Sequence, residues 1–398
     1  MTFHTGRFRI FVVIACTILL VPLSLTVSVA GVLAPSNPLG AIAWWPWSAA
    51  ANGNASALLM TSGRANYAHA REFAEKALRR RQALTPSAAR ALALIAVLQD
   101  RNPAVAERFM NLSERMSRRD YATQLLFIQT SVERGDVASA LVHYDRALRT
   151  SEEARTTLLP ILVAAVGDEG IARELAPYLA RQPMWKGDFL TALVLNGQNA
   201  RSIATLLASS RLQLEHLADR ALFVQGLQRI VQLGDPRLAY ATYRSVGGKT
   251  KAALLADGDF STDPVFPPFD WSFNDAGGIA ALREQGDGGK WALRIDLPSG
   301  SRGWVARQLV MLEPGRYRLS RTIAVDGSGG SDGQLSMTVR GVEGPVLLHE
   351  AQAGAGEAGF DMAAPGGCGA AWGVSGGGGR GESGATTFRL SDVKLTRS

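Results

Sequence analysis

Glycine is distributed unevenly along this chain, and the point where its frequency changes limits the folds that the chain can adopt. Of the 42 glycines, 28 lie after Ala256. Because glycine weakens helices and is frequent in the turns between strands, this change predicts two kinds of structure joined near residue 256.

The balance of charged residues changes at the same point. Residues 35–256 hold 27 Lys and Arg against 18 Asp and Glu, and residues 257–398 hold 13 against 17. The net charge of +7 therefore belongs to the amino-terminal part, which argues against a nucleic-acid partner.

A run of 25 residues without a charge covers residues 10–34. As a helix it would span about 37 Å at ~1.5 Å per residue, more than the ~30 Å hydrocarbon core of a bilayer. Arg7 and Arg9 precede it, so the positive-inside rule predicts a cytoplasmic tail over residues 1–9 and an external location for the bulk of the chain. The sequence predicts a transmembrane helix over residues 10–34. A cleavable signal peptide ending at Ala30 is the alternative.

Residues 35–60 are predicted to form a linker. It contains the sequence Trp44-Trp45-Pro46-Trp47, whose rings favour a membrane–water interface. The two cysteines are Cys16, in the predicted span, and Cys368, so no intrachain disulfide is expected outside the membrane. Cys368 is expected to be a small buried hydrophobe with an unpaired thiol.

Residues 61–250 consist of short, amphipathic, alanine- and leucine-rich segments separated by brief polar breaks, which predicts helices. In the segment GDVASALVHYDRAL, two alanines one heptad apart share a helix face and allow a neighbouring helix to approach closely, while an aromatic residue fills the gap between them. This pattern resembles the second helix of a tetratricopeptide repeat, with the expected packing residues Ala140, Tyr144, Ala147 and Leu148.

The same pattern recurs along this region at about the 34-residue period of the tetratricopeptide repeat. Successive spacings are 36, 34, 32, 32 and 35 residues between Ala70, Ala106, Ala140, Ala172, Ala204 and Ala239. The region is therefore expected to be an α-helical solenoid that offers a concave surface to extended partners. An irregular helical bundle is the alternative.

From residue 257 to residue 398 the segments are short, alternating or β-branched, and bounded by Gly, Pro, Asp or Ser. Strand-like runs at this spacing, with no helical pattern between them, predict an antiparallel β-sandwich or jelly roll. The strand rhythm and the phrases Gly258-Asp259-Phe260, Pro268-Phe269-Asp270-Trp271 and LEPGRYRLS resemble carbohydrate-binding modules and galactose-binding-like domains.

Taken as a whole, the chain resembles tetratricopeptide-type proteins associated with bacterial exopolysaccharide gene clusters. The shared features are the phrases DGDF and PPFDW and a final strand preceded by a Gly/Cys/Trp segment. The resemblance implies a single-pass protein of the bacterial inner membrane, with the bulk of the chain in the periplasm, that acts in envelope or exopolysaccharide assembly or export.

The expected function is a non-catalytic scaffold that binds envelope proteins through the solenoid and polysaccharide through the sandwich. The alternative is a tethered glycan-binding module, and the third hypothesis is an envelope hydrolase.

Sugar binding requires an aromatic platform with polar groups nearby. Trp271 is the predicted ligand contact, with Asp270 and Asn274 as its polar neighbours. The alternative is that the tryptophans of this part of the chain fill the sandwich core. The other candidates are Trp291, Trp304 and Trp372.

The motifs that could indicate catalysis are weak. Residues 373–377 fit G-x-S-x-G, but a nucleophile elbow needs a strand before the serine and a helix after it. The five histidines are scattered singly, which gives no zinc pattern. Asp257, Asp259 and Asp263 form the one tight carboxylate group, and we interpret them as turn residues rather than as a calcium site. We therefore expect no catalytic residue, metal or cofactor.

Overall fold

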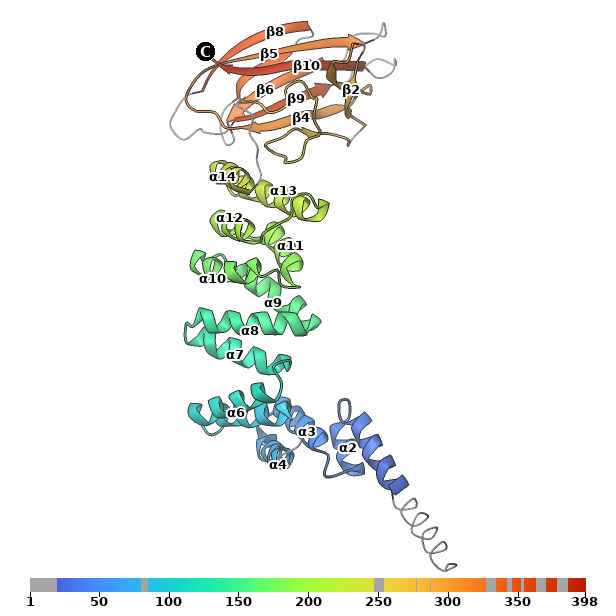
Figure 1. Ribbon diagram of the computed structural model, residues 1–398, viewed down its shortest axis with the longest axis vertical. Coiled ribbons are helices and arrows are strands. Elements are labelled where there is room, and N and C mark those ends of the chain that lie inside the picture. Colours follow the sequence, from blue (N-terminus) through green and yellow to red (C-terminus); the bar gives the residue numbers. More distant parts are fainter. Residues whose placement is uncertain are drawn as a thin grey trace, which may run out of the picture. The chain divides into compact units, whose positions relative to one another are not determined.

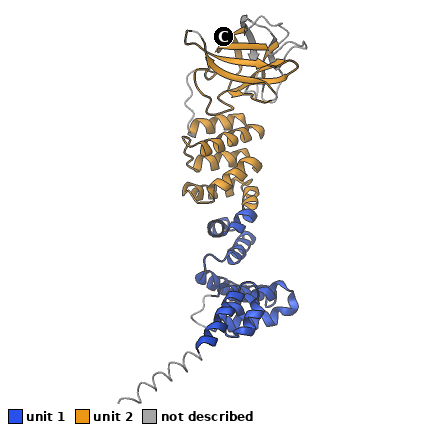
Figure 2. Cartoon of the chain, turned by 90° about the vertical axis from the view of Figure 1, so that its right-hand side faces the viewer, with its two compact units in different colours: residues 1–158 blue, residues 159–398 orange. Residues whose placement is uncertain are grey.

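The computed structural model describes residues 20–79, 85–246, 254–276, 278–286, 288–326, 334–341, 346–351, 354–362, 370–377 and 386–398. In this part of the chain the helices end at Val246 and the strands begin at Ser272 (Figure 1). The predicted order, a helical region followed by an antiparallel β-sheet domain, is confirmed. The chain divides into two compact units, residues 1–158 and residues 159–398 (Figure 2).

The helices of the first unit are short and follow one another closely. After a helical segment over residues 20–33, they are α2 (Pro38–Trp44), α3 (Ala49–Thr61), the 3₁₀ turn η1 (Arg64–Asn66), α4 (Tyr67–Leu78), α5 (Pro86–Leu98), α6 (Pro103–Met116), α7 (Tyr121–Glu133), α8 (Val137–Thr150) and α9 (Glu152–Ala165), which continues into the second unit. The second unit continues with α10 (Glu169–Ala180), α11 (Lys186–Asn196), α12 (Ala200–Ser209), α13 (Leu217–Gln232) and α14 (Pro236–Val246).

From α6 onward, the even-numbered helices each begin with an Asp or Asn cap, and α7 also has one, Asp120. Each of these side chains accepts a hydrogen bond from a backbone N–H in the first turn of its helix, where the N–H groups have no intrahelical partner. The capping residues of the even-numbered helices are Asn102, Asp136, Asp168, Asn199 and Asp235. Their spacing is close to that of the recurring alanines, as a solenoid of helix pairs would require, and the solenoid stays a prediction. The identity of the helix pairs as tetratricopeptide repeats stays a prediction as well.

The residues predicted to pack the helix pairs are buried. In α8, Ala140, Tyr144, Ala147 and Leu148 have exposed fractions of 5%, 8%, 0% and 1%. Their counterparts in the other helices are buried as well: Ala70, Ala106, Ala172, Ala204 and Ala239. Small side chains on one face let neighbouring helices approach closely, as the heptad spacing requires.

The prediction of a linker over residues 35–60 is wrong, because α2 and α3 occupy most of it. Helix α3 was missed because it has no polar face: Ala51, Asn52, Gly53, Ala55 and Ser56 are all buried. A helix enclosed on several sides lacks the amphipathic pattern that sequence analysis detects. The rings of Trp44 and Trp47 are 50% and 60% exposed.

The predicted membrane span is only partly covered by the structure. None of the helices in the described ranges combines the length and apolar character needed to cross a bilayer. Residues 10–19 of the predicted span, together with the predicted tail over residues 1–9, lie outside the described residues.

The β-domain consists of two antiparallel five-stranded sheets (Figure 1). One has the order β1-β4-β9-β6-β7 and the other β2-β3-β10-β5-β8. The strands are β1 (Ser272–Phe273), β2 (Ala280–Gln285), β3 (Trp291–Leu297), β4 (Arg302–Val310), β5 (Gly315–Asp326), β6 (Gln334–Gly341), β7 (Val346–Ala351), β8 (Gly354–Met362), β9 (Ala370–Gly377) and β10 (Thr386–Arg397).

The two sheets share one apolar core, to which side chains of both contribute, among them Leu293, Val305, Leu319, Met337 and Leu390. At Gly376 of β9 the opposite sheet comes so close that a Cβ would lie 2.6 Å from a methyl carbon of Leu297. This residue is therefore glycine for a packing reason, and the two sheets form the sandwich that the strand rhythm predicts.

The segment before β1 joins the last helices to the sandwich. The Phe269 ring packs on Tyr240 and Tyr243 of α14, with centroids 5.3 and 5.2 Å apart, and Phe266 packs on Phe223 of α13 at 6.0 Å. Burial, with a smaller contribution from Asp270, raises the pKa of Tyr243 to about 12. This aromatic contact lies within the second compact unit, which contains helices as well as strands, although the change of secondary structure lies near residue 256.

Candidate ligand-binding face of the β-sandwich

Trp271, the predicted ligand contact, lies in the sandwich core. Its side chain is 1% exposed. Its indole Nε1–H donates a hydrogen bond of 3.0 Å to the backbone carbonyl of Asp257, and the Phe260 ring lies 5.0 Å away between centroids. A ring enclosed in this way offers no face to a ligand. The prediction is therefore corrected: Trp271 is a core residue, as the alternative interpretation has it.

The two polar residues predicted beside Trp271 form hydrogen bonds with backbone groups. The Asp270 carboxylate accepts hydrogen bonds from the backbone N–H groups of Val265 and Phe266, at 2.9 and 2.8 Å. The Asn274 side chain is buried, and its amide donates to the carbonyl of Trp304 at 2.8 Å. Asp270 thus closes a turn within the segment before β1, Asn274 binds β4, and the three predicted residues do not form a binding site.

A different tryptophan faces outward, from the sheet β1-β4-β9-β6-β7. Strand β4 has a register shift between Trp304 and Ala306, which leaves Val305 and Ala306 both buried. The extra residue turns Trp304 and Arg307 to the outer face of the sheet. In β6 the core residues Leu335, Met337 and Val339 alternate with the outward residues Gln334, Ser336, Thr338 and Arg340.

Backbone pairing arranges the outward residues of three adjacent strands in three rows. Each row runs from β4 across β9 to β6, and we call the nine residues the β4–β9–β6 face. The rows are Arg307–Gly373–Thr338, Trp304–Ser375–Ser336 and Arg302–Gly377–Gln334.

Contacts within the rows show that these residues share one side of the sheet. The hydroxyl oxygens of Ser336 and Ser375 are 2.9 Å apart. A Cβ placed on Gly373 would lie 3.7 Å from the Cβ of Arg307, and one placed on Gly377 would lie 3.8 Å from the Cγ of Arg302. The central strand therefore presents two glycines and a serine, which form a low floor between its neighbours.

Trp304 stands at the edge of this floor. Its side chain is 38% exposed, and the guanidinium carbon of Arg307 lies 4.4 Å from the centre of its ring. Neighbouring strands are about 4.8 Å apart, so Trp304 and Ser336 are separated by roughly 10 Å across the floor. The face thus combines an apolar ring, hydroxyl groups that both donate and accept hydrogen bonds, and flanking guanidinium groups.

The residues considered for catalysis and metal binding have structural roles in the described ranges. Ser375 lies within strand β9, not at a turn between a strand and a helix, so the G-x-S-x-G match is not a nucleophile elbow. The Asp257 carboxylate accepts from the backbone N–H groups of Ser261 and Thr262, and Asp263 pairs with Arg283. No group of three or more His, Cys, Asp or Glu side chains among the described residues could hold a metal ion.

Of the three other positions considered, the structure describes the side chain of one. Trp291 is half-buried, with the Arg283 guanidinium carbon 5.2 Å from its ring centre. The side chain of Trp372 lies outside the described part of the structure, and so does Cys368.

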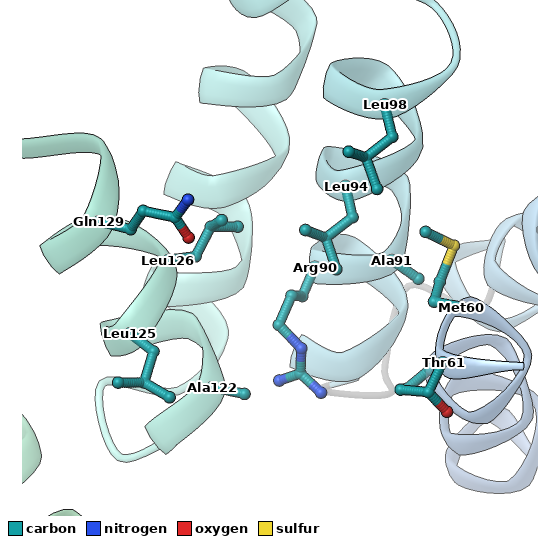
Figure 3. A pocket seen from close by; sticks show the side chains of 11 residues that line it. Met60, Thr61, Arg90, Ala91, Leu94, Leu98, Ala122, Leu125, Leu126 and Gln129 are labelled. Atoms are coloured by element: carbon teal, nitrogen blue, oxygen red, sulfur yellow. The ribbon is translucent and has the colours of Figure 1, made fainter. Parts of the chain in front are cut away.

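The first unit has a concave surface of its own, between helices α3, α5 and α7 (Figure 3). The cavity has a volume of about 400 Å³. Arg90, whose guanidinium pairs with Asp120, lies at one side of it, and Gln129 at the other. The rest of the lining is almost entirely apolar: Ala57, Met60, Thr61, Ala91, Leu94, Leu98, Ala122, Leu125 and Leu126.

Comparisons with known proteins give similarities of structure only. No protein-family model matches the chain, and no curated protein sequence matches it. One similar solved structure is a family 61 carbohydrate-binding module in complex with β-1,4-galactotriose. It is 16% identical with a TM-score of 0.29, and the match covers 37% of this chain and 100% of that one.

Two further solved structures have comparable scores. The xylan-binding domain of a Paenibacillus barcinonensis protein is 13% identical with a TM-score of 0.22, and 32% of this chain and 85% of that one are covered. A structure of accessory secretory proteins of Streptococcus pneumoniae is 14% identical with a TM-score of 0.23, covering 33% of this chain and 98% of that one. At these scores the similarities carry no functional conclusion, which must come from the residues of this chain.

Proposed function

We propose that this protein is a non-catalytic glycan-binding protein, and that its β-sandwich binds a polysaccharide on the β4–β9–β6 face. The observation that carries the proposal is the position of Trp304 beside the floor formed by Gly373, Ser375 and Gly377. This is the arrangement that a sugar chain requires, because the apolar C–H face of a pyranose ring packs on an aromatic ring. The hydroxyl groups of the sugar need hydrogen-bonding partners close to that aromatic ring.

The small residues of β9 support this proposal. Without side chains beyond a hydroxymethyl group, the floor lets a sugar ring stacked on Trp304 approach the sheet closely. The Ser336 and Ser375 hydroxyls lie in the same row as Trp304, and Gln334 and Thr338 lie in the neighbouring rows. The sheet is a rigid element, so these groups are held in place before a ligand arrives, which lowers the entropic cost of binding.

The test is affinity electrophoresis of the full chain, in a neutral detergent, through gels that each contain one polysaccharide. We expect at least one polysaccharide to retard the native chain and Trp304→Ala to remove the retardation. The matched control is Leu282→Ala, which truncates a 61% exposed apolar side chain on strand β2 of the opposite sheet. Retardation by no polysaccharide, or equal retardation of the native chain and Trp304→Ala, contradicts the proposal.

A second candidate function is a scaffold that binds an envelope protein through the helical region. The observation that favours it is the cavity between α3, α5 and α7, because apolar concave surfaces of this kind accommodate the side chains of a partner. The test is crosslinking in intact cells from a photoreactive residue at position 126. A crosslinked envelope protein that disappears with Leu94→Asp and persists with Leu195→Asp, at an exposed position of α11, supports this function. The absence of any specific crosslink contradicts it.

We further propose that residues 10–34 anchor the chain in the bacterial inner membrane and that its bulk is periplasmic. We also propose that its helix pairs form a tetratricopeptide-like solenoid and that the protein acts in exopolysaccharide assembly or export. The uncharged run after Arg7 and Arg9 supports the anchor, and the repeating Asp and Asn caps support the solenoid. Protease treatment of spheroplasts tests the location: degradation of the chain in intact spheroplasts is expected, and full protection overturns it.

A further inference from the structure

Two arginines of the β4–β9–β6 face and a third beside it have no described carboxylate that neutralises them. Arg302 and Arg307 lie on β4 at the ends of the two outer rows, and Arg340 follows Thr338 on the outward side of β6. All three side chains are exposed. Within the described ranges, none of them forms an ion pair or a side-chain hydrogen bond. The face itself contains no Asp or Glu.

The opposite sheet of the same sandwich shows the contrasting arrangement. On its outer side the Arg389 guanidinium pairs with Glu284 at 2.6 Å, and Arg294 pairs with Asp296 at 3.1 Å. The hydroxyl of Thr387 also donates to Asp296, at 2.7 Å. These two arginines of the opposite sheet are therefore neutralised by neighbouring carboxylates.

The contrast is sharper because this part of the chain is acidic. Residues 257–398 contain 13 Lys and Arg and 17 Asp and Glu, a net charge of −4. This part of the chain therefore has more carboxylates than cations, and among the described residues Glu284 and Asp296 pair with arginines of the opposite sheet. Unpaired cations gathered on the other sheet produce a locally positive potential that attracts an anionic ligand.

The position of Arg307 connects this charge to the proposed sugar platform. Its guanidinium lies 4.4 Å from the centre of the Trp304 ring. Stacking uses the flat side of a guanidinium and leaves its N–H groups free to bind a carboxylate or sulfate in a bidentate manner. An anionic group on a sugar stacked at Trp304 would therefore meet the N–H groups of the Arg307 guanidinium, which are held in place by the ring. Arg302 and Arg340 lie where neighbouring sugars of the same polysaccharide would pass.

We infer that the ligand of this face is an acidic polysaccharide, one whose sugars carry carboxylate or sulfate groups. The inference rests on the proposed glycan-binding function and adds the chemical class of the glycan. Arg307 binds the anionic group beside Trp304, and Arg302 and Arg340 bind anionic groups on adjacent residues of the polymer.

The experiment compares polymers that differ in charge and share a backbone. The full chain is run through gels containing polygalacturonate, its carboxyl-reduced neutral form, dextran sulfate or dextran. We expect retardation by the charged member of one pair or both, and at least roughly tenfold weaker binding to its neutral counterpart, as the loss of a charge-assisted hydrogen bond predicts. Arg307→Gln should weaken binding to the charged polymer by a similar factor. Lys394→Gln, an exposed cation on β10 of the opposite sheet, should not weaken it.

The outcomes separate this inference from the proposed function. Equal binding of charged and neutral polymers, still abolished by Trp304→Ala, overturns the inference and leaves the glycan-binding function standing. Retardation by none of the four polymers, nor by any other polysaccharide, overturns both. Equal losses with Arg307→Gln and Lys394→Gln show a general effect of net charge and overturn the inference. The inference is also overturned if single-stranded DNA binds as tightly as the charged polysaccharide and Trp304→Ala does not weaken the binding of DNA.

Discussion

Replacing Trp271 by phenylalanine tests the difference between a core tryptophan and a surface tryptophan in this sandwich. The smaller ring cannot donate the hydrogen bond from Nε1 to the Asp257 carbonyl, although that carbonyl still accepts from the N–H of Phe260 at 3.0 Å. A hydrogen bond of this kind contributes about 1 kcal/mol. The side chain is 1% exposed, so roughly 40 Å³ of unfilled volume at ~24 cal/mol per Å³ adds about 1 kcal/mol.

The free energy of unfolding of the second unit should therefore decrease by about 2 kcal/mol, the sum of these two contributions. For a unit of this size that corresponds to a decrease of roughly 4–8 °C in the Tm. The assay is thermal unfolding of the full chain, followed by near-ultraviolet circular dichroism of the tryptophans. Trp304→Phe is the matched control: at 38% exposure it should change stability by less than about 0.5 kcal/mol. An unchanged Tm for Trp271→Phe together with a decrease for Trp304→Phe would refute the assignment of the two rings.

Three further predictions concern packing and protonation. Gly258→Ala should destabilise the second unit in urea, because its Cβ would overlap the carbonyl oxygen of Val393, whereas Gly187→Ala, with open space around it, should not. Ala147→Leu should cost the first unit about 1–3 kcal/mol by overpacking a fully buried position, measured by urea unfolding against the exposed control Ala104→Leu. Burial lowers the pKa of His143, with Glu114 acting in the opposite direction, so the unfolded chain binds this proton more readily. Stability of the first unit should then decrease as the pH falls through about 6.5, and His143→Gln should flatten this dependence between roughly pH 7 and pH 5.5; an equal slope in both chains would contradict it.

The helical region could be predicted from the sequence because the signals that specify its helices are local. A cap such as Asp136 and a small-large-small face such as Ala140, Tyr144 and Ala147 lie within a few residues of one another. Helix α3 could not be predicted in this way, since its burial on several sides removes the polar face that identifies a surface helix.

The candidate site was not predictable to the same degree. Trp304 was one of four tryptophans considered in the sandwich, and the sequence favoured Trp271 because of its polar neighbours. Those neighbours, Asp270 and Asn274, turned out to bind backbone groups. Arg302 and Arg307 carried no sequence signal, because nothing in their own segment indicates which face of a sheet they occupy.

By itself the sequence determined where helices give way to strands, that the recurring alanines and the packing residues of α8 face inward, and that the glycine-rich end forms a sandwich. These features depend on composition and on periods of a few residues. Only the tertiary structure decided which ring faces solvent. In a strand, a shift of one residue turns every following side chain to the other face, and β4 contains such a shift between Trp304 and Ala306. The row that brings Trp304, Ser375 and Ser336 together joins residues up to 71 positions apart, and only the pairing of β4 and β6 with β9 sets them side by side.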